Sequence, residues 1–188
     1  MDQILVAVSA CIVRCIHLQK PECFFDPIYD ERVYRFHPFK SLKKHLTIDD
    51  IWKFLLKIQQ SQNLPIEAFV LCTIYVDRLS KSSCVYLNPF NWKRILMICL
   101  MVASKMFSDF PACNGDFIST FPHLDPMGTN QLERLFLKHI DYNVYVSSSV
   151  YTMYYFALIS MIRRTREERE GEDVGPFSPL LVALDLSH

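Results

Sequence analysis

The stretch Ile95-Leu96-Met97-Ile98-Cys99-Leu100-Met101-Val102-Ala103 consists of nine apolar residues without a break. Polar residues bound it on both sides, with Trp92-Lys93-Arg94 before it and Ser104-Lys105 after it. A helix that is apolar on every side, and too short to span a membrane, has to be surrounded by other elements of the same protein. The stretch therefore predicts the central helix of a helical bundle.

Apolar residues recur at helical spacing on both sides of this stretch, and no strand alternation of convincing length is present. The expected helices lie over residues 47–62, 66–80, 95–103, 116–120 and 129–140, with one further helix before them at 4–18 and one after them at 150–164. The sequence therefore predicts an all-α protein, with five central helices flanked by an N-terminal and a C-terminal helix.

The chain of 188 residues has room for one domain of ordinary size. Thr47, with Asp50 three residues later, is typical of a helix start, and the serines at 147–149 are typical of another. We therefore expect an N-terminal helix and irregular connector over 1–46, one domain over 47–146 and a C-terminal helix over 147–164. The mixed-charge and Gly/Pro-rich remainder, 165–188, is expected to be disordered.

The charges exclude several classes of partner. Twenty Lys and Arg balance twenty Asp and Glu, so no overall field attracts nucleic acid or an anionic membrane. We interpret the basic pairs Lys43-Lys44 and Lys93-Arg94 as solvated helix ends. The apolar segment 4–18 is too short to span a bilayer, which takes about 20 residues. Residue 2 is Asp rather than Gly, so neither membrane insertion nor N-terminal lipid anchoring is expected.

The seven cysteines are an odd number, and most lie in apolar helical stretches. This usage fits passive thiols in a reducing compartment, so we expect an intracellular protein of the cytoplasm, the nucleus or both. Cys11 and Cys15 share a helix face, but no zinc-binding spacing joins them to other residues. We predict neither a metal site nor a cofactor.

His123, Asp125 and Asp77 are the residues for which a chemical role can be considered. His123 and Asp125 could form an acid–base pair, but no second pair supports it, and a loop histidine beside a turn aspartate is the more economical interpretation. No glycine-rich phosphate-binding loop is present among only 4 glycines. We therefore predict no catalytic residues and no enzyme activity. Asp77 lies on a largely apolar helix and is expected to form a buried or half-buried ion pair that fixes helix packing.

Lys105 and Glu133 lie at complementary helix ends. Lys105 ends the apolar helix, where free carbonyls favour a cation, and Glu133 is expected in the first turn of a later helix, where an anion is favoured. From the residues alone, the helix dipole explains both.

Several runs in this order resemble the cyclin box, and more specifically the cyclin Y family. The runs are Tyr75-Val76-Asp77-Arg78-Leu79, Asn91-Trp92-Lys93-Arg94-Ile95, Ala103-Ser104-Lys105, Asn130-Gln131-Leu132-Glu133-Arg134 and Ser148-Ser149-Val150-Tyr151. The resemblance implies a single five-helix cyclin box over about residues 47–146, in which Trp92 and Asp77 have structural roles.

The resemblance also implies a function. Cyclins bind a cyclin-dependent kinase as a heterodimer and push its αC helix into place, which completes the kinase's own Lys–Glu ion pair. Carried over by position, Lys105 and Glu133 lie at the centre of the kinase interface, with Met106 and Phe107 supplying apolar contacts. Relatives of cyclin Y imply kinases of the PCTAIRE and PFTAIRE types.

Two alternatives keep the same fold. One is an adaptor or sequestering protein that binds a partner without activating a kinase. The other is a DNA-bound cyclin-like box, which would need a basic face that a net charge of zero argues against.

Overall fold

The computed structural model describes residues 3–18, 26–36, 43, 45–107 and 113–170, and of Phe107 and residues 163–170 the backbone alone. The described part contains seven α-helices, one short 3₁₀ helix and no strand, so the all-α prediction is confirmed. The elements are α1 (Gln3–His17), η1 (Pro27–Tyr29), α2 (Ile48–Gln62), α3 (Ile66–Ser83), α4 (Trp92–Phe107), α5 (Asn114–Thr120), α6 (Pro126–His139) and α7 (Ser148–Glu170).

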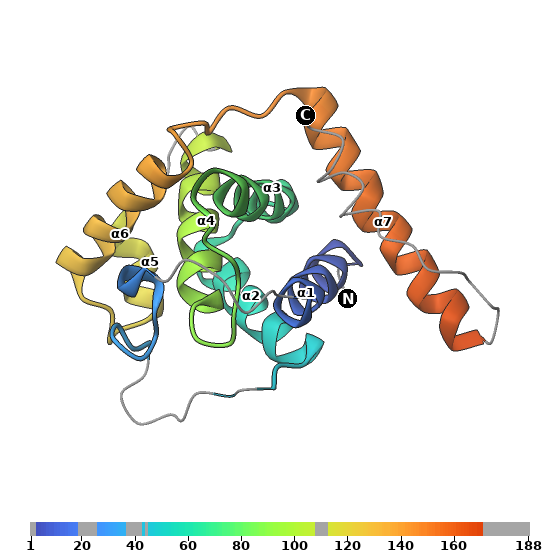
Figure 1. Ribbon diagram of the computed structural model, residues 1–188, viewed down its shortest axis with the longest axis horizontal. Helices are drawn as coiled ribbons and strands as arrows, with labels where there is room; N and C mark the ends of the chain where they lie inside the picture. The colour runs from blue at the N-terminus through green and yellow to red at the C-terminus, as the bar shows by residue number, and fades with distance from the viewer. Residues whose placement is uncertain (1–2, 19–25, 37–42, 44, 108–112, 171–188) are drawn as a thin grey trace.

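Helix α4 is the centre of the bundle. It lies between α3 and α2 on one side and α5 and α6 on the other, with α1 beyond α2 and α3 (Figure 1). All nine residues from Ile95 to Ala103 are buried, most of them completely. The apolar stretch that decides the fold is therefore surrounded on every side, as its composition predicts.

The starts of the helices follow local capping chemistry. At Thr47 the side chain accepts a hydrogen bond from the backbone N–H of Asp50, and the Asp50 carboxylate accepts one from the N–H of Thr47, which is a complete capping box. Ser147 accepts a hydrogen bond from the N–H of Val150 at 3.4 Å and so caps α7. Both starts agree with the sequence prediction.

Helix α6 begins earlier than predicted. Its cap is Asp125, whose carboxylate accepts a 2.6 Å hydrogen bond from the N–H of Gly128, and Thr129 lies inside the first turn. The reason is Pro126, whose fixed φ suits the first helical position and whose missing N–H costs nothing there. This cap gives Asp125 a structural use.

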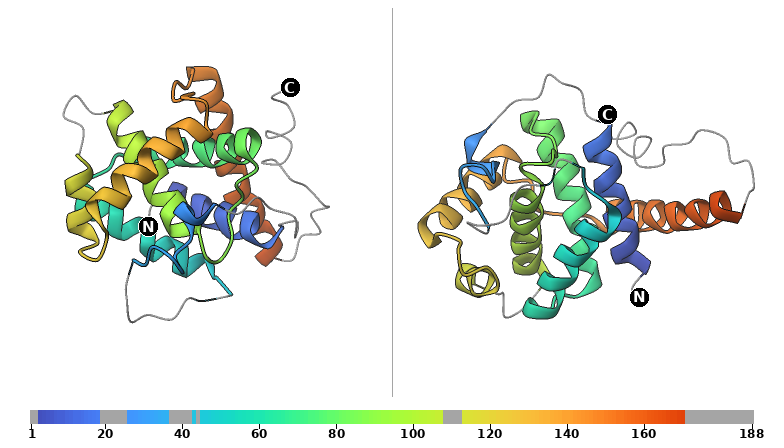
Figure 2. Two further views of the ribbon diagram at one scale, coloured as in Figure 1. Left: turned by 60° about the vertical axis from the view of Figure 1, so that its left-hand side comes forward. Right: turned by 90° about the horizontal axis from the view of Figure 1, so that it is seen from below.

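Helix α7 ends later than predicted. It continues to Glu170, past Arg164, and its second half extends beyond the other helices (Figure 2). Residues 165–170, which were expected to begin a disordered tail, are helical. Arg and Glu are good helix formers, and residues 148–170 contain no Gly or Pro. Residues 171–188 lie outside the described part of the chain.

The connector before α2 packs onto the N-terminal end of α4. Arg94 is buried, and its guanidinium donates a hydrogen bond from Nε to the carbonyl of Ile28 at 2.7 Å and lies 4.7 Å from the centre of the Tyr34 ring. Lys93 Nζ lies 2.7 Å from a carboxylate oxygen of Glu31, which is itself buried. The prediction of a solvated Lys93-Arg94 pair is therefore wrong, because residues far away in sequence fold over it.

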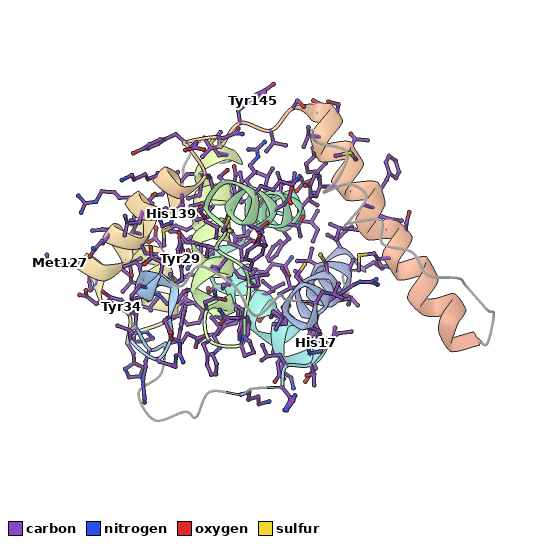
Figure 3. The ribbon with its side chains drawn as sticks, viewed as in Figure 1. His17, Tyr29, Tyr34, Met127, His139 and Tyr145 are labelled. Carbon is purple, nitrogen blue, oxygen red and sulfur yellow. The ribbon has the colours of Figure 1, made fainter. Side chains whose placement is uncertain are left out.

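The connector also reaches α6. The hydroxyl of Tyr29 lies 2.9 Å from Nδ1 of His139, and the two rings lie side by side between η1 and the end of α6 (Figure 3). Burial raises the pKa of the Tyr29 hydroxyl well above its usual value, so it stays protonated. This contact ties the N-terminal segment to the far end of the bundle.

The two residues expected to be structural both lie in the packed interior. Trp92 is buried at the start of α4, with its ring edge-on to that of Phe54 at 5.1 Å. Asp77 of α3 is buried, accepts a 2.5 Å hydrogen bond from the Tyr154 hydroxyl of α7 and lies 3.4 Å from Lys81 Nζ. Burial raises the pKa of Asp77 in spite of these partners. Asp77 therefore links α7 to α3.

Candidate partner-binding site

Three elements bring polar side chains together beside the C-terminal end of α4. Lys105 in the last turn of α4 forms an ion pair with Glu133 of α6, although 28 positions separate them in sequence. Asn114, the first residue of α5, accepts a 2.8 Å hydrogen bond from Lys105 Nζ and donates one of 2.7 Å to the second oxygen of Glu133. We call Lys105, Asn114 and Glu133 the charged triad.

The helix dipole accounts for one member of this triad only. Lys105 lies in the last turn of α4, where its positive charge interacts favourably with the free backbone carbonyls. Glu133 lies in the middle of α6 rather than in its first turn, because that helix begins at Pro126. A dipole effect falls off within one turn, so the expected explanation of Glu133 is wrong, and its pairing with Lys105 and Asn114 replaces it.

The charged triad lies at the surface. The side chain of Lys105 is 32% exposed and that of Glu133 is 17% exposed, so both are half-buried and reachable from solvent. Met106, which follows Lys105, is 47% exposed. Phe107 is the last residue of α4, and its side chain lies outside the described part of the structure. Charged and apolar groups thus occur side by side in the last turn of α4.

Sequence reasoning missed Asn114 and Asn130. Asn130 of α6 accepts a 2.7 Å hydrogen bond from the Asn114 amide and so extends the network along α6. Asn114 precedes Gly115, and an Asn-Gly pair is ordinarily read as a turn, which obscures any role for its side chain. Of the two, only Asn130 lies in a run that resembles the cyclin box, Asn130-Gln131-Leu132-Glu133-Arg134, which also contains Glu133.

The other candidate residues do not form a catalytic or metal-binding cluster in the described part of the chain. His123 is exposed in the turn before α6, and Asp125 is committed to capping that helix. In the described residues no three His, Cys, Asp or Glu side chains come together in a way that could hold a metal ion. Among these same residues, no helix is both long and apolar enough to cross a membrane.

Six of the cysteines are described, and each is a free thiol. Cys11, Cys72 and Cys99 are buried, and burial raises the pKa of the Cys99 thiol. Cys84 and Cys113 are exposed. Cys84 follows the last residue of α3, and Cys113 precedes the first residue of α5.

Helices α2 to α6 form a helical domain that is packed around a buried α4 and carries the half-exposed charged triad at its surface. The sequence matches the family model for cyclin over residues 33–144, which is more than half of the chain and includes all five of these helices. The chain therefore belongs to the cyclin family. Cyclins are regulatory proteins that bind cyclin-dependent kinases and are not themselves enzymes.

Proposed function

We propose that this chain is the regulatory subunit of a heterodimer in which it binds and activates a cyclin-dependent kinase of the PCTAIRE or PFTAIRE type. The observation that carries the proposal is the charged triad, which joins Lys105 of α4 to Glu133 of α6 at a half-exposed place beside the end of the central helix. These are the two residues that the cyclin resemblance assigns to the kinase interface.

The triad has the chemistry of a docking site for a protein backbone. An ammonium group carries three N–H donors, of which Lys105 uses one on Glu133 and one on Asn114. No described residue uses the third donor, which we propose for a carbonyl of a partner. The exposed side chain of Met106 supplies apolar area beside it, and Phe107 follows in the same turn. A kinase αC helix held here would be fixed in the position that its own Lys–Glu pair requires.

Three sequence runs support the cyclin Y relationship and hence the type of kinase. They are Asn91-Trp92-Lys93-Arg94-Ile95, Asn130-Gln131-Leu132-Glu133-Arg134 and Ser148-Ser149-Val150-Tyr151. They fall at the start of α4, in the middle of α6 and at the start of α7, so they come from three different helices. A resemblance that spans separate elements in the correct order supports a specific subfamily better than any one run.

Charge reversal of Lys105 tests the proposal. Lys105→Glu should leave the fold almost intact, because half-exposed ion pairs contribute about 0–1 kcal/mol to stability. It should weaken binding to a purified PCTAIRE-type kinase by about 2–5 kcal/mol, since a charge at the interface loses its partner. Glu133→Lys should do the same. The doubly reversed protein should recover little, because each group also bonds the kinase backbone.

Affinity and thermal midpoint are measured for each variant, together with the activity of the bound kinase. Unchanged affinity, or affinity lost only along with the fold, contradicts the interface. Binding of the wild-type chain without any increase in kinase activity favours the alternative of an adaptor or sequestering protein.

A further inference from the structure

We infer that Asn114 is a positioning residue of the partner-binding site: its side-chain amide holds Lys105 and Glu133 in the geometry that the partner meets. This inference deepens the proposed function and rests on it. Helix α5 has seven residues and contributes no charged residue to the site. Through Asn114 it nevertheless takes part in the interface.

The hydrogen bonds of the Asn114 amide are completely assigned. Its oxygen accepts from Lys105 Nζ at 2.8 Å, and its nitrogen donates to Glu133 Oε2 at 2.7 Å and to Asn130 Oδ1 at 2.7 Å. An amide nitrogen has two protons, so both are used. Asn114 thus touches both charges of the ion pair and also the helix that carries Glu133.

Asn114 is not needed to begin its own helix. An asparagine at a helix start commonly caps the helix with its side chain. Here the cap is Cys113, and the carboxylate of Asp116 accepts a 2.7 Å hydrogen bond from the N–H of Cys113. Because Asp116 meets that requirement, the amide of Asn114 is committed to the ion pair.

Helix α5 is anchored to α2 along its length, which fixes where Asn114 lies. Gln62 at the end of α2 donates to the carbonyl of Asp116 at 2.8 Å and to the hydroxyl of Thr120 at 2.7 Å. Ser61 lies 2.8 Å from the same hydroxyl. These contacts tie α5 to α2, on the side of the helix away from the ion pair. The amide is therefore held by the bundle and not by the flexible side chains that it contacts.

The consequence concerns affinity. Lysine and glutamate side chains lose rotamer freedom when a partner orders them, and a geometry that is already fixed in the free protein avoids part of that loss. Without the Asn114 amide, Lys105 and Glu133 still attract one another, but they sample several arrangements. We expect Asn114→Ala to weaken partner binding about 5- to 100-fold, on the usual cost of ordering two such side chains.

The experiment compares four variants for affinity toward a purified PCTAIRE-type kinase and for thermal midpoint: Asn114→Ala, Asn114→Asp, Lys105→Ala and Ser119→Ala. Asn114→Asp keeps the size of the side chain and its bond to Lys105, but places a carboxylate against Glu133. Ser119→Ala is the matched control, because Ser119 is exposed on α5 and its hydroxyl bonds the carbonyl of Asp116 within the same helix. The expected result is weaker binding for both Asn114 variants and affinity near wild type for Ser119→Ala.

The double variant Asn114→Ala/Lys105→Ala adds a readout that a purely structural role would not change. If Asn114 acts through Lys105, its loss should have little further effect on affinity once Lys105 is gone, so the two effects are not additive. Additive losses, or losses for Asn114→Ala and Ser119→Ala that simply follow their thermal midpoints, overturn the inference.

The remaining outcomes separate this inference from the proposed function. Weaker binding for Lys105→Ala with wild-type affinity for both Asn114 variants overturns the role of Asn114 and leaves the proposed function standing. Wild-type affinity for Lys105→Ala, or failure of the wild-type chain to bind the kinase, overturns the proposed function and this inference with it.

Discussion

The two ends of α4 both carry basic residues, but the protein uses them differently. At the N-terminal end Arg94 is 2% exposed and is enclosed by the connector, whereas at the C-terminal end the side chain of Lys105 is 32% exposed. In sequence both look like polar boundaries of one apolar helix. The difference shows that one end holds the connector in place, while the other is presented at the surface.

The helix dipole sharpens this contrast. A cation is favourable near the last turn of a helix and unfavourable near the first, so Lys105 suits its position and Lys93 and Arg94 do not. The structure offsets this by placing Glu31 beside Lys93 and the carbonyl of Ile28 against Arg94. Burial nevertheless lowers the pKa of Arg94 to about 10. The N-terminal end therefore needs tertiary contacts to offset the helix dipole, whereas at the C-terminal end the dipole itself favours the cation.

Removal of Arg94 should have the largest effect on stability. Arg94→Ala loses a charge-assisted hydrogen bond to Ile28 and a cation–π contact with Tyr34, which together cost roughly 2–5 kcal/mol. Urea denaturation measures the change in the free energy of unfolding. The control is Arg134→Ala, at an exposed position of α6, which should stay within about 0.5 kcal/mol of wild type. Equal effects of the two substitutions would remove the contrast between buried and exposed arginines.

The buried carboxylate at the same end should make stability depend on pH. Burial raises the pKa of Glu31 more than Lys93 lowers it, so the folded state holds the proton more tightly than the unfolded state does. Stability is then lost as pH rises through the folded pKa, because the buried group must ionise. Glu31→Gln does not titrate, so its free energy of unfolding relative to wild type should increase from pH 4 to pH 7.

Denaturation of both proteins across this pH range provides the measurement, and at low pH, where Glu31 is protonated in both states, the two should converge. A wild-type protein that gains stability over Glu31→Gln as pH rises would show that the ion pair with Lys93 outweighs burial.

The smallest effect is expected at the opposite end of the helix. Lys105→Ala removes half-exposed contacts and should change the free energy of unfolding by only about 0–1 kcal/mol. Denaturation under the conditions used for Arg94→Ala tests this directly. A loss as large as that of Arg94→Ala would mean that the charged triad holds the fold together, and would weaken its assignment to a partner.

Local features of the fold could be predicted wherever neighbouring residues determine them. The burial of α4 follows from nine consecutive apolar residues, and the start of α2 follows from Thr47 and Asp50, which lie one turn apart. Helix ends were less predictable. The start of α6 lies earlier because Pro126 suits the first helical position, and α7 continues through the charged residues 166–170 because Arg and Glu are good helix formers.

The sequence by itself determined that this protein is all-α, that α4 is central and which family it resembles, because periodicity and ordered motifs are properties of neighbouring residues. Only the tertiary structure decided which charged side chains are buried and which partners they contact. Arg94 is buried because residues 26–36 fold back over it, and Lys105 meets Asn114 and Glu133 because α5 and α6 pack beside the end of α4. Contacts between distant segments leave no local pattern, so the geometry of the charged triad exists only once the helices have packed.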